Sequence, residues 1–352
     1  PTYDPTDYDF EEYIGLENYQ SFVQQNYADI EYNNGFFGET DPIPIEHSRT
    51  HWLASQVQQS IIKHQQTVQP WYVEVNYAEP HLPCRPSDRF ATMYNPDQIP
   101  VWHNFAEEFI NKPYIQKQQL LNWKIDAFTW KEWAPIVARY YGIISQMDDS
   151  IGMIIQTLEE NNQLDDTLII YTSDHGDMCG AHRMMDKHYV LYDDIVKVPF
   201  FLRWPKQIKS GQTTNQFVYN MLDLPPTILE IAGIKKPNIL QGESIVPLLL
   251  GHSPTNWREY VVASSNGQQF GLFTQRMIRT KKFKYIWNTT DTDELYVLEQ
   301  DPGELTNCIQ NPEYRSVVTL LRRQLFQQLQ KDEDGLVANP WLRDQLLEGN
   351  KL

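Results

Sequence analysis

An acidic residue and a histidine stand side by side in the segment Ser173-Asp174-His175-Gly176, and Lys187 follows thirteen residues after Asp174. The run before this segment, residues 167–171, is apolar and β-branched, which is typical of a buried strand. In open α/β sheets, binding sites form at the carboxyl ends of strands. A carboxylate and an imidazole can hold a divalent metal ion, and a nearby lysine can reach an anion bound to that ion. The pattern predicts a metal and anion site, with an ordinary surface turn as the alternative.

Neighbouring residues favour the site over the surface turn. The run from Tyr171 to Lys187 continues into Tyr-Asp-Asp at 192–194 and Val-Pro-Phe-Phe-Leu-Arg-Trp-Pro at 198–205. This region resembles the second signature region of the sulfatase family, within the alkaline phosphatase superfamily. Further motifs follow in the family's order: Pro-His-Leu-Pro at 80–83, Asp-Leu-Pro-Pro-Thr at 223–227, Gln-Gly-Glu-Ser at 241–244 and Asp-Pro-Gly-Glu at 301–304. The resemblance extends from Asp9 to Asn307.

The resemblance implies a fold class and a domain layout. The expected class is α/β, with a mixed, largely parallel sheet between helices as in alkaline phosphatase, and a small C-terminal antiparallel α+β subdomain. We expect the first domain to cover residues 1–255, with its N-terminal part missing. We expect residues 256–352 to form the second, with short antiparallel strands and a final helix. Arg279, Asp301 and Glu304 are interpreted as a salt-bridge cluster that fixes this subdomain.

The resemblance also implies a hydrolase that cleaves a small anionic sulfate ester. In that case Asp174 and His175 are metal ligands, Lys187 binds a sulfate oxygen, and His81 contacts the sulfate or protonates the leaving group. His182 is expected to contact the substrate or to orient the metal ligands without binding the ion itself. The expected ion is Ca²⁺, while the nitrogen ligand from His175 leaves Mn²⁺ or another transition ion open.

The family's nucleophile motif is not found where the family places it. Family members begin with a strand carrying paired aspartates, followed by a Cys/Ser-x-Pro/Ala-x-Arg motif whose Cys or Ser is oxidised to formylglycine. Neither feature is found before residue 80. We therefore expect that this chain does not encode the formylglycine. We also expect the missing N-terminal segment to be a partner of this chain. Cys84 begins a similar stretch, but Asp88 occupies the place of the arginine.

Two other functions remain open. Phosphonate monoester and phosphodiester hydrolases of the same superfamily share the Asp-His-Gly motif, the lysine and the Pro-His loop. A truncated, non-catalytic relative that binds anions is the second alternative. The sequence does not identify the alcohol part of a substrate or the oligomeric state.

Composition excludes some classes of partner. Asp and Glu outnumber Lys and Arg by 46 to 29, for a net charge of −17, so we expect no nucleic acid, which needs a basic face. No apolar run approaches the ~18 residues of a spanning helix, so we expect no membrane partner. Three scattered cysteines favour a reducing compartment, the cytoplasm. A periplasmic or secreted location stays open, because a signal peptide would lie in the missing segment.

Hydrophobic periodicity predicts the elements that position these residues. Helices are predicted over residues 50–66, 135–161, 221–231 and 312–331. Strands are predicted over 71–77, 167–171 and 198–204, and then in short pieces at 260–264, 270–280, 283–288 and 294–298. Helices that alternate with strands indicate a layered α/β domain, and the short late strands indicate an antiparallel sheet.

Overall fold

The computed structural model describes residues 10–65, 67, 69–187, 190–252, 254–267 and 272–351. The chain divides into two compact units that interleave in sequence. The first comprises Pro1–Pro100 and Trp130–Thr167, and the second comprises Val101–Thr129 and Leu168–Leu352. The predicted domain boundary at residue 255 stays a prediction.

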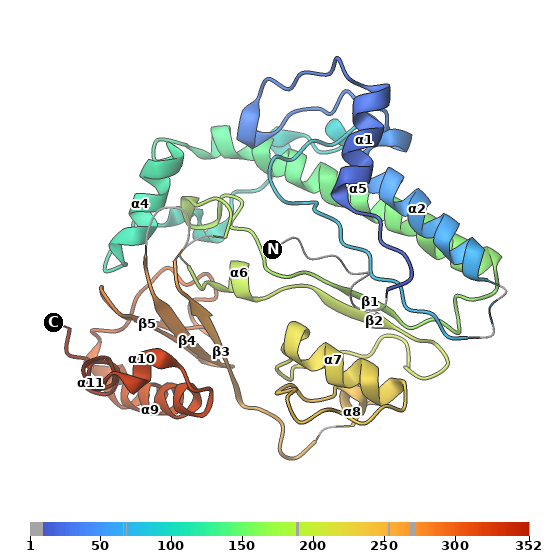
Figure 1. The fold of residues 1–352 in the computed structure, drawn as a ribbon. Helices are drawn as coiled ribbons and strands as arrows, with labels where there is room; N and C mark the ends of the chain where they lie inside the picture. The colour runs from blue at the N-terminus through green and yellow to red at the C-terminus, as the bar shows by residue number, and fades with distance from the viewer. Residues whose placement is uncertain are drawn as a thin grey trace. The chain divides into compact units, whose positions relative to one another are not determined.

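The first unit is built on two long helices, α2 (Arg49–His64) and α5 (Trp130–Glu160), which pack side by side (Figure 1). Their buried apolar residues recur at helical spacing, with Ala54, Val57 and Ile61 on α2 and Ile143 and Met147 on α5. Both helices were predicted from this periodicity and are confirmed. Shorter helices are α1 (Leu16–Asn26) and α3 (Asp88–Ala91), with 3-10 turns η2 (Gly35–Phe37), η3 (Ile45–His47) and η4 (Pro96–Gln98).

The predicted strand at residues 71–77 was wrong. In the described part of the chain this segment forms no strand, although its sequence alternates as a strand would. Tyr72 and Val73 are exposed, so neither has the cover of a neighbouring strand or helix that a sheet position provides. Alternation describes a surface that suits a sheet, but a strand exists only where a second backbone supplies hydrogen bonds.

The second unit contains an antiparallel sheet in the order β3-β4-β5-β6, formed by Tyr260–Ser265, Gln275–Thr280, Phe283–Asn288 and Glu294–Val297. Helices α9 (Arg315–Lys331), α10 (Gly335–Ala338) and α11 (Pro340–Glu348) lie along this sheet (Figure 1). Tyr285, Trp287 and Leu295 from the strands pack in one buried cluster with Leu321 and Leu325 from α9. The predicted late strands and the helix at 312–331 are confirmed, and α10 and α11 are additional. The strand predicted at 270–280 begins only at Gln275, and its residues 270 and 271 lie outside the described residues.

The same unit holds the strand that precedes the predicted site. β1 (Ile169–Thr172) pairs with β2 (Phe200–Arg203), with Thr172 opposite Phe200. The other helices are α4 (Tyr114–Trp123), α6 (Asp193–Val196), α7 (Asn220–Ile231) and α8 (Val246–Leu249), with 3-10 turns η5 (His103–Ala106), η6 (Ala181–Arg183) and η7 (Pro312–Tyr314). The β1–β2 pair is antiparallel, whereas the prediction placed a largely parallel sheet in residues 1–255. The ladders of β3 to β6 are antiparallel, as predicted for the C-terminal subdomain. No helix in the described residues is long and apolar enough to span a bilayer.

Candidate active site

Asp174 and His175 lie one residue beyond the end of β1 and form a pair of adjacent ligand groups. His175 Nδ1 lies 2.8 Å from the carbonyl oxygen of Gly176, so this nitrogen carries the proton and donates it. In the neutral imidazole, Nε2 then carries the lone pair that a metal ion requires, and Nε2 lies 3.4 Å from Asp174 Oδ2. Two ligands bound at about 2.1–2.4 Å to one ion are about 3 Å apart when their bonds meet near a right angle. The pair therefore fits a shared divalent cation.

Exposure of this pair is compatible with a binding site. The Asp174 side chain is 76% exposed and that of His175 is 33% exposed. The described residues contain no cluster of three or more His, Cys, Asp or Glu groups that could hold a metal. Because Ca²⁺ takes about six to eight ligands, Asp174 and His175 can supply only part of its coordination.

Gly176 lets the backbone pass close to α6. Its N–H donates to the carbonyl oxygen of Ile195 over 2.8 Å. A Cβ at this position would lie 1.8 Å from the carbonyl oxygen of Asp194, a distance at which atoms clash. On the other side of the motif, Asn220 on α7 donates to the carbonyl oxygen of Ser173 over 2.6 Å. The glycine of the Asp-His-Gly motif is therefore required by packing.

Lys187 lies on the loop that begins at Gly176. Its backbone N–H donates to Asp186 Oδ1 over 2.8 Å, and its Nζ lies 3.6 Å from the same oxygen. Asp177 Oδ1 accepts hydrogen bonds from the backbone N–H groups of Cys179 and Asp186, which folds the loop back on itself. The Lys187 side chain is 23% exposed. Its contact with a substrate anion stays a prediction.

His182 is fully buried within this loop. Its Nδ1 lies 2.7 Å from Glu107 Oε2, and Lys112 Nζ lies 3.3 Å from the same oxygen. Burial by itself would raise the pKa of Glu107, but the hydrogen bond from His182 and the charge of Lys112 lower it. Within the described residues His182 Nε2 has no hydrogen-bond partner. This position indicates support of the loop, and direct substrate contact by His182 stays a prediction.

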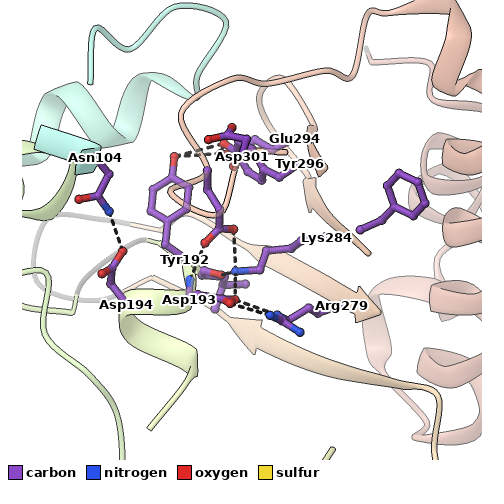
Figure 2. A network of polar contacts seen from close by, with 12 residues as sticks. Asn104, Tyr192, Asp193, Asp194, Arg279, Lys284, Glu294, Tyr296 and Asp301 are labelled. Carbon is purple, nitrogen blue, oxygen red and sulfur yellow. Dashed lines mark hydrogen bonds and ion pairs between the residues drawn. The ribbon is translucent and has the colours of Figure 1, made fainter. Parts of the chain in front are cut away.

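A buried polar network lies beside the loop, and sequence reasoning found only part of it, without Asp193 and Lys284 (Figure 2). Asp193, the first residue of α6, accepts two hydrogen bonds from Arg279, at 2.9 and 2.7 Å, and lies 2.6 Å from Lys284 Nζ. The interpretation that pairs Arg279 with Asp301 and Glu304 is wrong in its partners. Glu304 forms an ion pair with Lys284 at 2.7 Å. Asp301 accepts hydrogen bonds from the backbone N–H groups of Leu305 and Thr306.

His81 lies in the first unit, on the Pro-His-Leu-Pro loop. Its side chain is exposed, and its Nδ1 lies 2.7 Å from the carbonyl oxygen of Leu82. The peptide bonds before Pro80 and Pro83 are both cis. Cys84 follows on the same loop and is buried, with 1% exposed. This burial favours the interpretation of Cys84 as a loop cysteine, and the catalytic role of His81 stays a prediction.

The modification pattern does occur in this chain, at a place that the sequence analysis passed over. Cys179-Gly180-Ala181-His182-Arg183 fits Cys-x-Ala-x-Arg, so the expectation that no formylglycine motif is encoded was wrong as a statement about pattern. This stretch lies inside the segment that resembles the second signature region. Ala181 is buried, the N–H of Gly180 donates to the Met184 carbonyl, and the Cys179 carbonyl accepts from Trp102. The packing indicates a structural role for the stretch.

Comparisons with known proteins agree with these features. A family model described as "Sulfatase" matches residues 2–234, and one described as "N-sulphoglucosamine sulphohydrolase, C-terminal" matches residues 180–332. The chain therefore belongs to the sulfatase family, within the alkaline phosphatase superfamily.

Individual relatives point the same way. An arylsulfatase of Clostridium perfringens is 31% identical over 86% of this chain and 60% of its own length. An N-acetylglucosamine-6-O-sulfatase of Bacteroides thetaiotaomicron is 32% identical over 62% of this chain and 38% of its own length. The solved structure of a phosphonate monoester hydrolase from Silicibacter pomeroyi has a TM-score of 0.78 and 23% identity, covering 91% of this chain and 69% of that one. The predicted α/β fold class is confirmed. The chain spans 60% of the length of the arylsulfatase and 38% of the length of the N-acetylglucosamine-6-O-sulfatase.

Proposed function

We propose that a protein containing this chain is a metal-dependent sulfuric ester hydrolase. One observation carries the proposal: in a sulfatase-family chain, His175 Nε2 is set with its lone pair available, 3.4 Å from Asp174 Oδ2. The hydrogen bond from Nδ1 to a backbone carbonyl fixes the tautomer that a metal ligand requires. We propose Ca²⁺ as the ion, with Mn²⁺ as the alternative, because the donor pair combines oxygen with nitrogen. Such an ion, when bound, would withdraw charge from the ester group.

The other predicted residues have roles at the ester itself. Lys187 presents a cation that would bind an oxygen of the sulfate group as negative charge gathers there. His81 would hold or donate the proton that the leaving oxygen requires. By family resemblance the nucleophile is a formylglycine, and we propose that it lies on a segment outside this sequence. Cys179, which fits the modification pattern, is the alternative position within it.

The relatives suggest which esters to test. The N-acetylglucosamine-6-O-sulfatase relative and the sulphohydrolase model support a sulfated amino sugar, and the arylsulfatase relative supports an aryl sulfate. The phosphonate monoester hydrolase structure gives a second candidate function for the same site, phosphonate ester cleavage. The two functions differ in the charge and geometry of the transferred group, which turnover can separate.

The test compares three substrates with the natural protein that contains this chain, loaded with Ca²⁺: an aryl sulfate, glucosamine 6-sulfate and an aryl phosphonate monoester. We expect a sulfate ester to have the highest kcat/KM and a chelator to abolish turnover. A higher kcat/KM for the phosphonate would replace the proposal with the second function. Absence of turnover with all three, in protein shown to bind the ion, would indicate a non-catalytic relative.

A further inference from the structure

We infer that Asp193 is a positioning residue: the C-terminal sheet holds its carboxylate, and Asp193 in turn fixes α6 against the loop that carries Asp174 and His175. The consequence for metal binding rests on the proposed function. The structural part, which concerns how the loop is held, does not depend on it.

The argument begins with two cations on the sheet. Arg279 on β4 and Lys284 on β5 are directly opposite each other in the antiparallel ladder. Like charges in this position destabilise a strand pair unless an anion lies between them. Asp193 supplies that anion, since it is bound by both side chains, as Figure 2 shows.

Lys284 has a complete set of acceptors although it is fully buried. Its Nζ lies 2.6 Å from Asp193 Oδ1, 2.7 Å from Glu304 Oε1 and 3.1 Å from the carbonyl oxygen of Leu191. An ammonium group has three N–H donors; the Leu191 carbonyl accepts a hydrogen bond from Lys284, and the two carboxylates form ion pairs with it. The two cations and the two carboxylates balance in charge, which is the condition under which a buried ionic cluster is tolerated.

Asp193 is accordingly held as an ionised group. Burial by itself would raise its pKa, but hydrogen bonds from Arg279 and the charge of Lys284 lower the pKa of Asp193 to about 2. Its backbone is held as well, because the Asp193 N–H donates to Glu304 Oε2 over 2.6 Å. Side chain and backbone of this one residue are thus both attached to the C-terminal part of the unit.

The attachment continues from Asp193 through α6 to the metal-ligand loop, which is the segment after β1 that carries Asp174, His175 and Gly176. This helix has a single turn, so its first residue fixes the direction of the whole element. Two residues after Asp193, the carbonyl oxygen of Ile195 accepts the hydrogen bond from Gly176, which follows His175 directly. The close approach of Gly176 to the Asp194 carbonyl makes this junction intolerant of a shift. Movement of Asp193 would therefore be transmitted to His175.

The same sheet offers a matched control. Arg276, also on β4, forms an ion pair with Asp334 at 2.6 Å. Its hydrogen-bond partners among the described residues, Asp334, Asn266, Ser265 and Gln275, all lie outside the metal-ligand loop. Arg276→Met therefore removes a buried ion pair from this strand without removing a contact to the loop. Arg279→Met removes an ion pair from the same strand and weakens the hold on Asp193.

The experiment measures hydrogen exchange of the Gly176 amide, at single-residue resolution, in wild type, Asp193→Asn, Arg279→Met and Arg276→Met. We expect exchange at Gly176 to be at least about tenfold faster in the first two variants and unchanged in Arg276→Met, while amides of β5 keep their protection in all three. If Asp193→Asn does not fold, Arg279→Met decides alone. Unchanged exchange at Gly176 in a folded Asp193→Asn or Arg279→Met variant would overturn the inference, as would equal acceleration by Arg276→Met.

A second measurement connects the inference to the ion. Ca²⁺ titration of the natural protein should give a Kd at least about tenfold weaker for Arg279→Met than for Arg276→Met, because outer partners orient ligands. Equal affinities in these two variants would overturn the effect of Asp193 on the ligand pair. If the wild-type protein binds no divalent ion, the proposed function fails, and the exchange of Gly176 still tests how the loop is held.

Discussion

The imidazole of His182 lies flat on the phenol ring of Tyr192, with ring centroids 4.0 Å apart and planes at 2°. Both residues belong to the segment between the metal-ligand pair and α6. The Tyr192 hydroxyl contacts Lys112 at 3.0 Å, and Lys112 in turn contacts Glu107, the partner of His182. The stacked rings therefore close a cycle of buried contacts that holds the loop from within.

The first prediction concerns the stability of this cycle. His182→Ala should reduce the free energy of unfolding by about 3 kcal/mol, because it removes one of the hydrogen bonds to the buried Glu107 carboxylate and opens a cavity beside Tyr192. Urea denaturation of the purified variant measures this loss. His252→Ala, at an exposed histidine, should change stability by less than about 0.5 kcal/mol. A similarly small effect of His182→Ala would show that the cycle contributes little.

The second prediction concerns metal content. Asp174→Ala and His175→Ala should each weaken Ca²⁺ binding by at least about tenfold in the natural protein, because each removes a donor from an incomplete shell. Isothermal titration measures the Kd. Asp344→Ala, at an exposed carboxylate on α11, is the control and should leave the Kd unchanged. Retention of wild-type affinity by both site variants would remove Asp174 and His175 from the metal site.

The third prediction concerns turnover. Lys187→Ala and His81→Ala should each lower kcat/KM on the cognate ester by about tenfold or more, since one lost transition-state contact costs about 1.4 kcal/mol or more. Steady-state kinetics of the natural protein test this, with the exposed Lys235→Ala as the control. Wild-type kinetics in either variant would end the assignment of that residue.

The fourth prediction follows from the lowered pKa of Asp193. Since the folded-state value, about 2, lies below the ordinary 3.8, the ionised carboxylate stabilises the fold above pH 4. This stabilisation is lost as the pH falls through the interval from about 4 to about 2.

A comparison of wild type with Asp193→Asn measures the effect. The difference in their free energies of unfolding should be about 2 kcal/mol at pH 6 and about 1 kcal/mol smaller at pH 3. Urea denaturation at both pH values supplies the numbers. A difference that stays constant with pH would show that Asp193 has the same pKa in both states.

The fifth prediction concerns the two cysteines that begin stretches similar to the modification motif, Cys84 and Cys179. Neither Cys84→Ala nor Cys179→Ala should abolish sulfatase turnover of the natural protein, because Cys84 is buried and Cys179 belongs to a structural loop. Cys308→Ala, at the remaining cysteine, serves as the reference for a neutral change. Loss of turnover in Cys179→Ala without loss of stability, together with a mass change at Cys179 in the wild-type protein, would place the formylglycine in this chain.

Local pattern was sufficient to predict much of the fold. The β-branched run at 167–171 gave β1, and helical spacing of apolar residues gave α2, α5 and α9 within a few residues. These elements are encoded within one short segment each. The prediction of a strand at 71–77 failed because a strand requires a pairing partner elsewhere in the chain. The alternation of apolar and polar residues carries no information about that partner.

The site was predictable only in part for the same reason. Asp174 and His175 are neighbours in sequence, so their proximity was visible at once. Asp193 and Lys284 are far apart along the chain, and their contact depends on the register that sets Arg279 opposite Lys284. The register of two strands is fixed by their turn and their packing. No rule of sequence spacing predicts that Asp193 binds the two opposed cations.

The three acceptors of Lys284 have a consequence for the evolution of this family branch. A guanidinium at position 284 would bring five donors into a space with three acceptors, and an apolar residue would leave Asp193 and Glu304 facing each other without their shared cation. Positions 193, 284 and 304 can therefore change only together. In an alignment of relatives that share this sheet, these three columns should covary as one inherited unit, although position 193 lies 91 residues before position 284 in the chain.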